Sequence, residues 1–194
     1  MGTVVQLKNR INNSYSELKN SVDDKLILVE EKIKTKLSSK VDLVEEMTKY
    51  HFRTGGKRLR ALLTLGSAKL CGYYKGSRDV NLAACVELIH AATLMHDDVI
   101  DKGEVRRGKK TLNNIWGNKS SILVGDYLLS RCFEMMVEDG NIEVLKLLSS
   151  TSSKIAQGEV LQLQHQGEVL QLQYEGEIDM LEETYLKIIS AKTA

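Results

Sequence analysis

One long apolar stretch, residues 79–101, reads Asp79-Val-Asn-Leu-Ala-Ala-Cys-Val-Glu-Leu-Ile-His90-Ala-Ala-Thr-Leu-Met-His-Asp97-Asp98-Val-Ile-Asp101. Before the closing acids, apolar residues recur at steps of three and four, which is typical of a helix. The same spacing continues through almost the whole chain, which contains no proline and little alternation of β-branched residues. The sequence therefore predicts an all-α protein, built as a helical bundle.

On either side of this stretch, turn residues divide the chain into further helices. The spacing predicts two amphipathic helices within residues 4–50, a break over 51–56, and a helix over 59–70. A second break follows at 72–77, a loop is expected at 102–111, and helices are expected at 120–138, 141–164 and 181–193. The length of 194 residues fits a single domain over 1–194.

An octapeptide is repeated near the C-terminal end. Gln157-Gly-Glu-Val-Leu-Gln-Leu-Gln164 returns as Gln166-Gly-Glu-Val-Leu-Gln-Leu-Gln173, so residues 157–173 contain a local duplication rather than a solenoid repeat. A nine-residue shift turns a helix by about half a revolution. We therefore expect that the chain either loops out one copy or loses the original packing beyond it.

The acids that close residues 79–101 predict a metal site. Residues seven and eleven apart on a helix point within about 20° of each other, which puts His90, Asp97 and Asp101 on one stripe. Asp98 is turned away by about 80°, so Asp97 and Asp101 are the expected direct ligands. Two carboxylates with room for phosphate oxygens suit Mg²⁺, and arginines follow at Arg106-Arg107-Gly108. The alternative is a solvated helix end that carries three acids.

A second charged segment, Gly55-Gly56-Lys57-Arg58-Leu59-Arg60, combines a turn with the start of a helix. Lys57 and Arg60 are three residues apart and share a face, beside the backbone N–H groups of the helix start. This arrangement predicts a second phosphate-binding site. The alternative is a basic helix N-terminus without a ligand.

The overall composition limits the partners. The 27 basic and 26 acidic residues nearly cancel, so nothing points to a nucleic acid or a membrane surface. No signal peptide or transmembrane segment is recognisable, and we expect a cytoplasmic protein. The cysteines form no CxxC pair.

Taken together, the motifs Gly-Gly-Lys-Arg-x-Arg, His-x6-Asp-Asp-x-x-Asp, Arg-Arg-Gly and Gly125-Asp-Tyr, in this order, resemble those of the trans-type polyprenyl diphosphate synthases. Residues from about 50 to 194 carry the resemblance, which is strongest to the long-chain, octaprenyl-type members. It implies the all-α isoprenoid synthase fold, a homodimer, and Mg²⁺ as cofactor. The implied reaction condenses isopentenyl diphosphate with an allylic diphosphate into a long all-trans polyprenyl diphosphate.

The resemblance also implies roles for single residues. Isopentenyl diphosphate would be held by Lys57, Arg60, His90 and Arg107. Asp97 and Asp101, supported by Asp98, would bind Mg²⁺ on the allylic diphosphate. That diphosphate would also be contacted by Arg106, Lys192 and Thr193. Chain length in this family depends on the residues just before the first aspartate motif, and the small Ala92 and Thr93 favour a long product.

Three departures from the family pattern are visible. Ala61 stands where proline is common, the 157–173 duplication is an insertion, and no second DDxxD motif occurs before Ala194. We therefore expect the N-terminal part of a synthase, with its C-terminal helices missing and a C-terminal fragment as a further partner. The alternative is a weakly active or inactive helical protein that binds diphosphate without turning it over.

Overall fold

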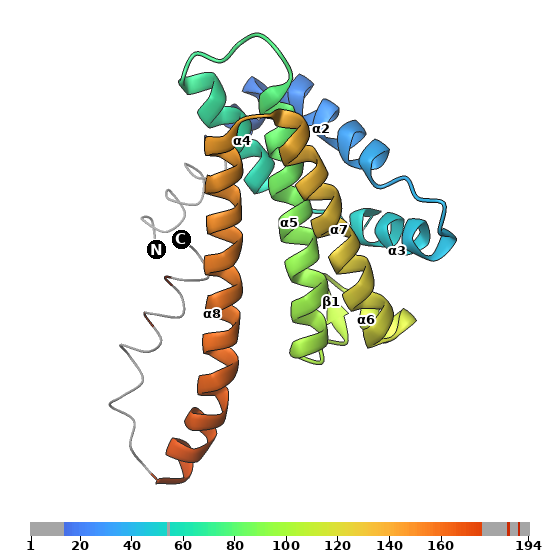
Figure 1. Cartoon of the computed structure of the whole chain (residues 1–194), viewed down its shortest axis with the longest axis vertical. Helices are drawn as coiled ribbons and strands as arrows, with labels where there is room; N and C mark the ends of the chain where they lie inside the picture. Colours follow the sequence, from blue (N-terminus) through green and yellow to red (C-terminus); the bar gives the residue numbers. More distant parts are fainter. Residues whose placement is uncertain (1–13, 54, 176–185, 187–189, 191–194) are drawn as a thin grey trace, which may run out of the picture. The chain divides into compact units, whose positions relative to one another are not determined.

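The computed structural model describes residues 14–53 and 55–175, together with residues 186 and 190. It divides the chain into two compact units, Met1–Gly140 and Asn141–Ala194, and each is described here by itself. The described residues are overwhelmingly helical, so the all-α prediction is confirmed (Figure 1).

The first unit is a bundle of helices with one very short hairpin. Residues 14–21 are helical, and they are followed by α2 (Asp23–Lys36), α3 (Asp42–Arg53), α4 (Leu59–Leu70), α5 (Arg78–Ile100), α6 (Leu112–Trp116) and α7 (Asn118–Asp139). Between α5 and α6, strands β1 (Val105–Arg106) and β2 (Lys109–Lys110) pair antiparallel.

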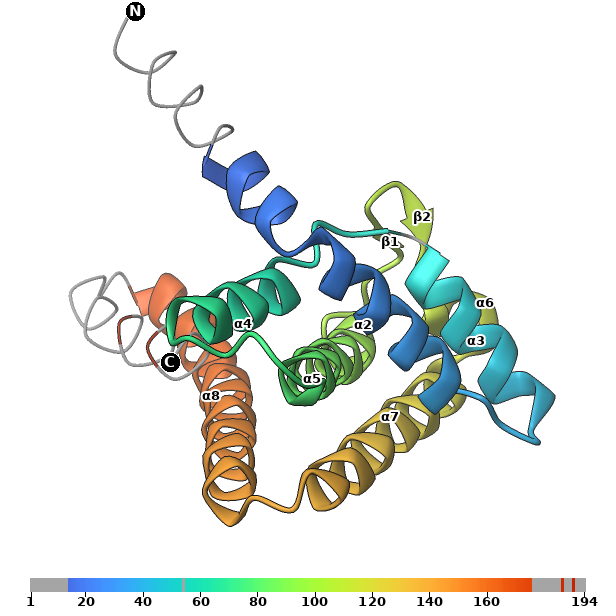
Figure 2. The ribbon, with the colours of Figure 1, turned by 90° about the horizontal axis from the view of Figure 1, so that it is seen from above.

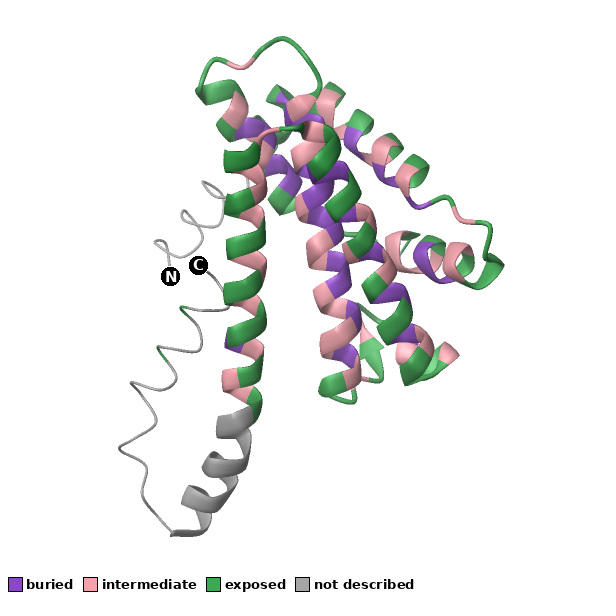
Figure 3. Ribbon diagram, viewed as in Figure 1, coloured by how far each residue is buried: buried purple, intermediate pink, exposed green. Residues whose placement is uncertain are grey.

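Helix α5 forms the centre of this unit. It packs against α2, α4 and α7, and Figure 2 shows it between these helices. Many of its buried side chains are small, among them Ala83, Ala84, Ala91 and Ala92. Buried residues, coloured purple, recur along the length of α5 in Figure 3. Small side chains let neighbouring helices approach closely, so α5 is held firmly along its length. Its C-terminal end, where the acids lie, is thereby fixed in position.

The N-terminal end of α5 is held by two ion pairs whose carboxylates are buried. Asp79 in its first turn pairs with Lys25 of α2, and Arg78 binds Asp139 at the end of α7 with an Nε–Oδ1 distance of 2.7 Å. The side chains of Asp79 and Asp139 are only 3% and 2% exposed, so each needs its cation.

Most predicted helix bounds are close to those observed. Helix α4 has the predicted bounds, and α5 is displaced by one residue at each end. The break predicted over 51–56 begins later than expected, because α3 continues to Arg53, and residues 55 and 56 are non-helical. Phe52 packs under the guanidinium of Arg58, 5.2 Å from its ring centre. The segment predicted as a loop at 102–111 contains the hairpin, and α6 was not predicted.

The second unit contains α8 (Ile142–Glu175), a helix of 34 residues. Asn141 begins it, since its Oδ1 accepts hydrogen bonds from the N–H groups of Glu143 and Val144 at 3.0 and 3.1 Å. The helix runs without interruption through both copies of the duplicated octapeptide, so neither copy loops out. The predicted end at residue 164 is therefore too early. The helix predicted over 181–193 lies outside the described residues, except that residues 186 and 190 are helical.

None of the described helices is both long enough and apolar enough to cross a membrane.

Candidate active site

A cavity of about 580 Å³ opens in the first unit beside the C-terminal half of α5. Its walls come from the end of α3, the loop before α4, the start of α4, helix α5 and the hairpin. The lining residues used below are Tyr50, His51, Lys57, Arg58, Arg60, Glu87, His90, Asp98, Arg106, Arg107 and Lys110.

The four residues predicted to hold isopentenyl diphosphate all line this cavity. Lys57 lies in the loop before α4, Arg60 in the first turn of α4, His90 on α5, and Arg107 in the turn between β1 and β2. Segments that are far apart in the sequence therefore bring one histidine and three cations together. This convergence is what a site for a phosphorylated ligand requires.

The loop before α4 has a constrained backbone. Arg58 immediately precedes α4 in the left-handed conformation, with φ 46° and ψ 40°. Its guanidinium pairs with Glu30 and lies 3.7 Å from the carboxylate of the buried Glu87, which also accepts the N–H of Ala61 at 3.1 Å. Arg58 thus fixes the loop, and Lys57 and Arg60 on either side of it are left to face a ligand. The motif alone did not reveal this structural role for Arg58.

Arg107 reaches across from the hairpin to the same loop. Its backbone is also left-handed, with φ 53°, and its Nη1 donates a hydrogen bond to the carbonyl oxygen of Gly55. A Cβ at Gly56 would lie 2.7 Å from this nitrogen, so glycine at that position leaves room for the guanidinium. The double glycine therefore allows Arg107 to approach the loop closely.

The cavity carries an excess of positive charge. Arg58 and Arg106 are neutralised by acids. In the part of the chain that the structure describes, no carboxylate pairs with the other lining cations, namely Lys57, Arg60, Arg107 and Lys110. Four cations around one cavity suit a highly charged anion such as a diphosphate.

Two histidines beside these cations are held neutral. Burial, followed by the positive charge of Arg58, lowers the pKa of His51 to about 4. Burial, followed by the charge of Arg60, lowers the pKa of His90 to about 4. Both imidazoles therefore remain uncharged near neutral pH, and each can donate one hydrogen bond and accept another. His51 was not predicted as a site residue, because its place at the end of α3 was not foreseen.

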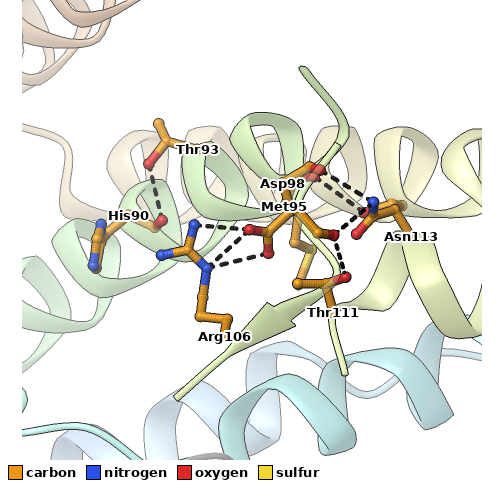
Figure 4. Close-up of polar contacts among 9 residues, drawn as sticks. His90, Thr93, Met95, Asp98, Arg106, Thr111 and Asn113 are labelled. Carbon is orange, nitrogen blue, oxygen red and sulfur yellow. Dashed lines mark hydrogen bonds and ion pairs between the residues drawn. The ribbon is translucent and has the colours of Figure 1, made fainter. Parts of the chain in front are cut away.

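Asp98 is buried and ion-paired, whereas Asp101 is exposed. The side chain of Asp98 is 11% exposed and accepts hydrogen bonds from Arg106 on both oxygens, from Nη2 to Oδ1 at 2.7 Å and from Nε to Oδ2 at 3.2 Å (Figure 4). The cavity is lined by Asp98 together with His90, Ala91 and Leu94 of α5, and Asp97 is not among its lining residues. Asp98 therefore faces the cavity from α5, whereas the metal-binding role of Asp97 stays a prediction. Arg106, for which a contact with the allylic diphosphate stays a prediction, is bound by Asp98.

Asp97 and Asp101 lie one turn apart at the C-terminal end of α5. Asp101 follows the last residue of the helix and is exposed, and no basic residue lies in the last turn. Carboxylates at a helix C-terminus face the negative end of the helix dipole, and a bound cation would offset this repulsion. Among the described residues, no three acidic, histidine or cysteine side chains form a complete metal cluster. A pair of carboxylates nevertheless fits Mg²⁺ when waters and phosphate oxygens supply its other ligands.

Ala92 and Thr93, the residues predicted to set the product length, are not among the lining residues of the cavity. Ala92 is fully buried, and Thr93 is half-buried with its hydroxyl donated to the carbonyl of His90 at 2.9 Å. Lys192 and Thr193 lie outside the described residues.

Comparison with known proteins agrees with these features. A family model described as polyprenyl synthetase matches residues 41–194, which is most of the chain. The chain belongs to the polyprenyl synthetase family. It is similar to octaprenyl diphosphate synthase of Escherichia coli, with 41% identity over 158 residues. That match covers 81% of the chain and 46% of the relative.

Solved structures give the same family. A decaprenyl diphosphate synthase from Rhodobacter capsulatus matches with a TM-score of 0.81 and 42% identity, over 92% of this chain and 52% of that one. A polyprenyl synthase from Caulobacter crescentus, complexed with calcium and isoprenyl diphosphate, matches with a TM-score of 0.80 and 38% identity, over 93% and 52%. The chain thus spans about half the length of the relatives it matches.

Proposed function

We propose that this chain carries the isopentenyl diphosphate site and the first metal site of a trans-prenyltransferase. The reaction would join isopentenyl diphosphate to an allylic diphosphate and make a long, octaprenyl-like polyprenyl diphosphate. One observation carries the proposal: Lys57, Arg60, His90 and Arg107 line one cavity. These three cations and Lys110 have no carboxylate partner among the described residues. The long-chain relatives, at 38–42% identity, support the substrate class.

Each part of the site would have its own task. The cations of the cavity would hold the diphosphate of isopentenyl diphosphate, and neutral His90 would donate one hydrogen bond to it. Asp97 and Asp101 would hold Mg²⁺, which supplies positive charge to the leaving diphosphate of the allylic substrate. Lys192 and Thr193 would contact that same diphosphate. We further propose a homodimer, and a long product because Ala92 and Thr93 are small.

Lys57 gives the direct test of the cavity. Isothermal titration calorimetry with isopentenyl diphosphate, without metal, should show affinity at least about tenfold lower for Lys57→Ala, because a charged hydrogen bond to phosphate is lost. Lys109→Ala is the matched control, since Lys109 is exposed on β2 and does not line the cavity. Equal affinity of both variants and the unaltered chain would overturn the assignment of the cavity.

A further inference from the structure

Asn113, in the first turn of α6, ties the hairpin to the end of α5. Its Nδ2 donates hydrogen bonds to two carbonyl oxygens, those of Asp98 and Gly103, each at 3.1 Å (Figure 4). The oxygen of Gly103 also accepts the hydroxyl of Thr111 at 2.6 Å. Gly103 precedes the hairpin and Thr111 follows it, so both ends of the hairpin and the last turn of α5 meet at one point.

The chemistry of this junction requires an amide. Two carbonyl acceptors need two protons from one group, which an NH₂ supplies, whereas a hydroxyl has one and a carboxylate has none. Among the described residues, the Oδ1 of Asn113 is the one buried side-chain polar atom without a hydrogen-bond partner. The two hydrogen bonds donated by Nδ2 therefore orient the amide, and Oδ1 is left without a hydrogen bond.

The hairpin fixed in this way carries two arginines of the site. Arg106 binds the carboxylate of Asp98, and Arg107 donates to Gly55 across the cavity. Asp98 thus gives its side chain to Arg106 and its backbone oxygen to Asn113. A second support comes from Tyr50, whose hydroxyl donates to the carbonyl of Lys110 at 2.9 Å and whose ring packs edge-on against Trp116.

We propose that Asn113 is a positioning residue for diphosphate binding. By clamping the hairpin to α5 through two carbonyls, it sets the place of Arg106 and Arg107, although it does not line the cavity itself. This inference rests on the proposed diphosphate site. It assigns the strength of anion binding in part to a neutral side chain outside the cavity.

The test compares two isosteric variants of adjacent residues. Asn113→Asp places a carboxylate against two carbonyl oxygens, whereas Asn114→Asp adds the same charge at an exposed residue whose single contact, to the carbonyl of Glu104, measures 3.4 Å. Inorganic pyrophosphate is titrated into the full chain by calorimetry at pH 8. We expect Asn113→Asp to bind at least about tenfold more weakly than Asn114→Asp, because the junction loses both donors and gains repulsion.

The pH profile separates positioning from general damage to the fold. The two carbonyl oxygens beside the introduced carboxyl disfavour its charged form and raise its pKa. Toward pH 5 it should therefore take up a proton before the exposed carboxyl of Asn114→Asp does and donate one hydrogen bond, so the ratio between the two variants should shrink. If the unaltered chain binds no pyrophosphate, the proposed function fails. If it binds and the two variants bind equally at pH 8, or keep the same ratio at pH 5, the inference about Asn113 fails.

Two further variants cover the case in which Asn113→Asp does not fold. Asn113→Ala removes the donors without adding charge, and Thr111→Val removes the hydroxyl donated to Gly103 while keeping the shape. Each should bind pyrophosphate about two- to tenfold more weakly, in line with the loss of one or two hydrogen bonds. Unchanged affinity in both, with melting curves that show folded protein, would overturn the proposal.

Discussion

Asp98 and Asp101, three residues apart, illustrate how neighbouring acids of one motif differ in physical state. Asp98 is buried and bound to Arg106, whereas Asp101 is exposed beyond the end of α5. We expect Asp98→Asn to lower the free energy of unfolding by about 1–3 kcal/mol, because Arg106 loses its charged partner. Asp101→Asn should leave it unchanged or raise it by up to about 1 kcal/mol, since a negative charge leaves the helix C-terminus.

Urea unfolding of both variants at pH 7 measures this difference. A second measurement is the increase in pyrophosphate affinity on addition of Mg²⁺, which should be smaller for Asp101→Asn than for the unaltered chain. A larger loss of stability in Asp101→Asn than in Asp98→Asn would show that the roles of the two acids are misassigned.

His51 and His90 give a pH dependence with a definite sign. Both have folded pKa values of about 4, below the ordinary value of 6.5, so the unfolded chain takes up protons first as the pH falls. Their contribution to stability is complete above pH 6.5 and is lost as the pH falls from 6.5 toward 4. We expect the free energy of unfolding to drop by about 2–4 kcal/mol between pH 7 and pH 5 through these two groups.

NMR titration of the imidazole signals provides the direct measurement. Both rings should remain neutral down to about pH 5 in the free protein, and the variant His90→Gln should lose part of the pH dependence of unfolding. Midpoints near 6.5 for both rings would contradict the burial and charge described for the cavity.

Single residues also show where prediction from sequence stops. Lys57, Arg60, His90 and Arg107 were predicted together, and they do line one cavity. The binding of Arg106 to Asp98 was not predicted, because it depends on the hairpin folding back against α5. A helical-wheel argument places side chains on their own helix but says nothing of what folds against that helix.

At the scale of elements, periodicity was sufficient for the long helices and insufficient for the short ones. Helices α4 and α5 match their predicted spans closely, because many apolar positions define each. Helix α6 and the two-residue strands are too short to carry a period. They are fixed instead by side-chain hydrogen bonds from Thr111 and Asn113, which only the folded chain brings together.

The duplicated octapeptide makes a prediction for helix α8. Because α8 is continuous through both copies, the second copy is displaced by about 13.5 Å and turned by about 180° from the first. Deletion of residues 166–174 should leave a continuous helix. It should also remove the shift of about 13.5 Å and 180° that the second copy adds to the residues after it. Circular dichroism should show a loss of helix confined to the deleted residues. A larger loss would mean that the second copy is needed for the helix itself.

At the scale of the whole molecule, the chain offers a test of how much chemistry it supports. We expect weak elongation when it is incubated alone with farnesyl diphosphate, isopentenyl diphosphate and Mg²⁺, and more product when the C-terminal half of a long-chain relative is supplied. The reason is that these 194 residues span about half the length of the relatives they match and contain one DDxxD motif. Chromatography of the products with and without that half measures the effect, and a deletion in the added half is the control.

Robust long-chain product from the chain alone would refute this expectation. Binding of both diphosphates without any product under either condition would favour the alternative, a helical protein that binds diphosphate. Whether residues 1–194 act as a single domain stays a prediction, because the two compact units are described separately.

The left-handed backbone of Arg107 places stability and activity in opposition. Glycine adopts this conformation freely, whereas other residues incur about 1 kcal/mol, so Arg107→Gly should be more stable than Arg107→Ala by roughly that amount. Any selection for thermal resistance alone would thus draw this position toward glycine and remove a cation of the cavity. Attempts to raise the thermal stability of this protein by consensus design or directed evolution should therefore screen for ligand affinity as well as melting temperature.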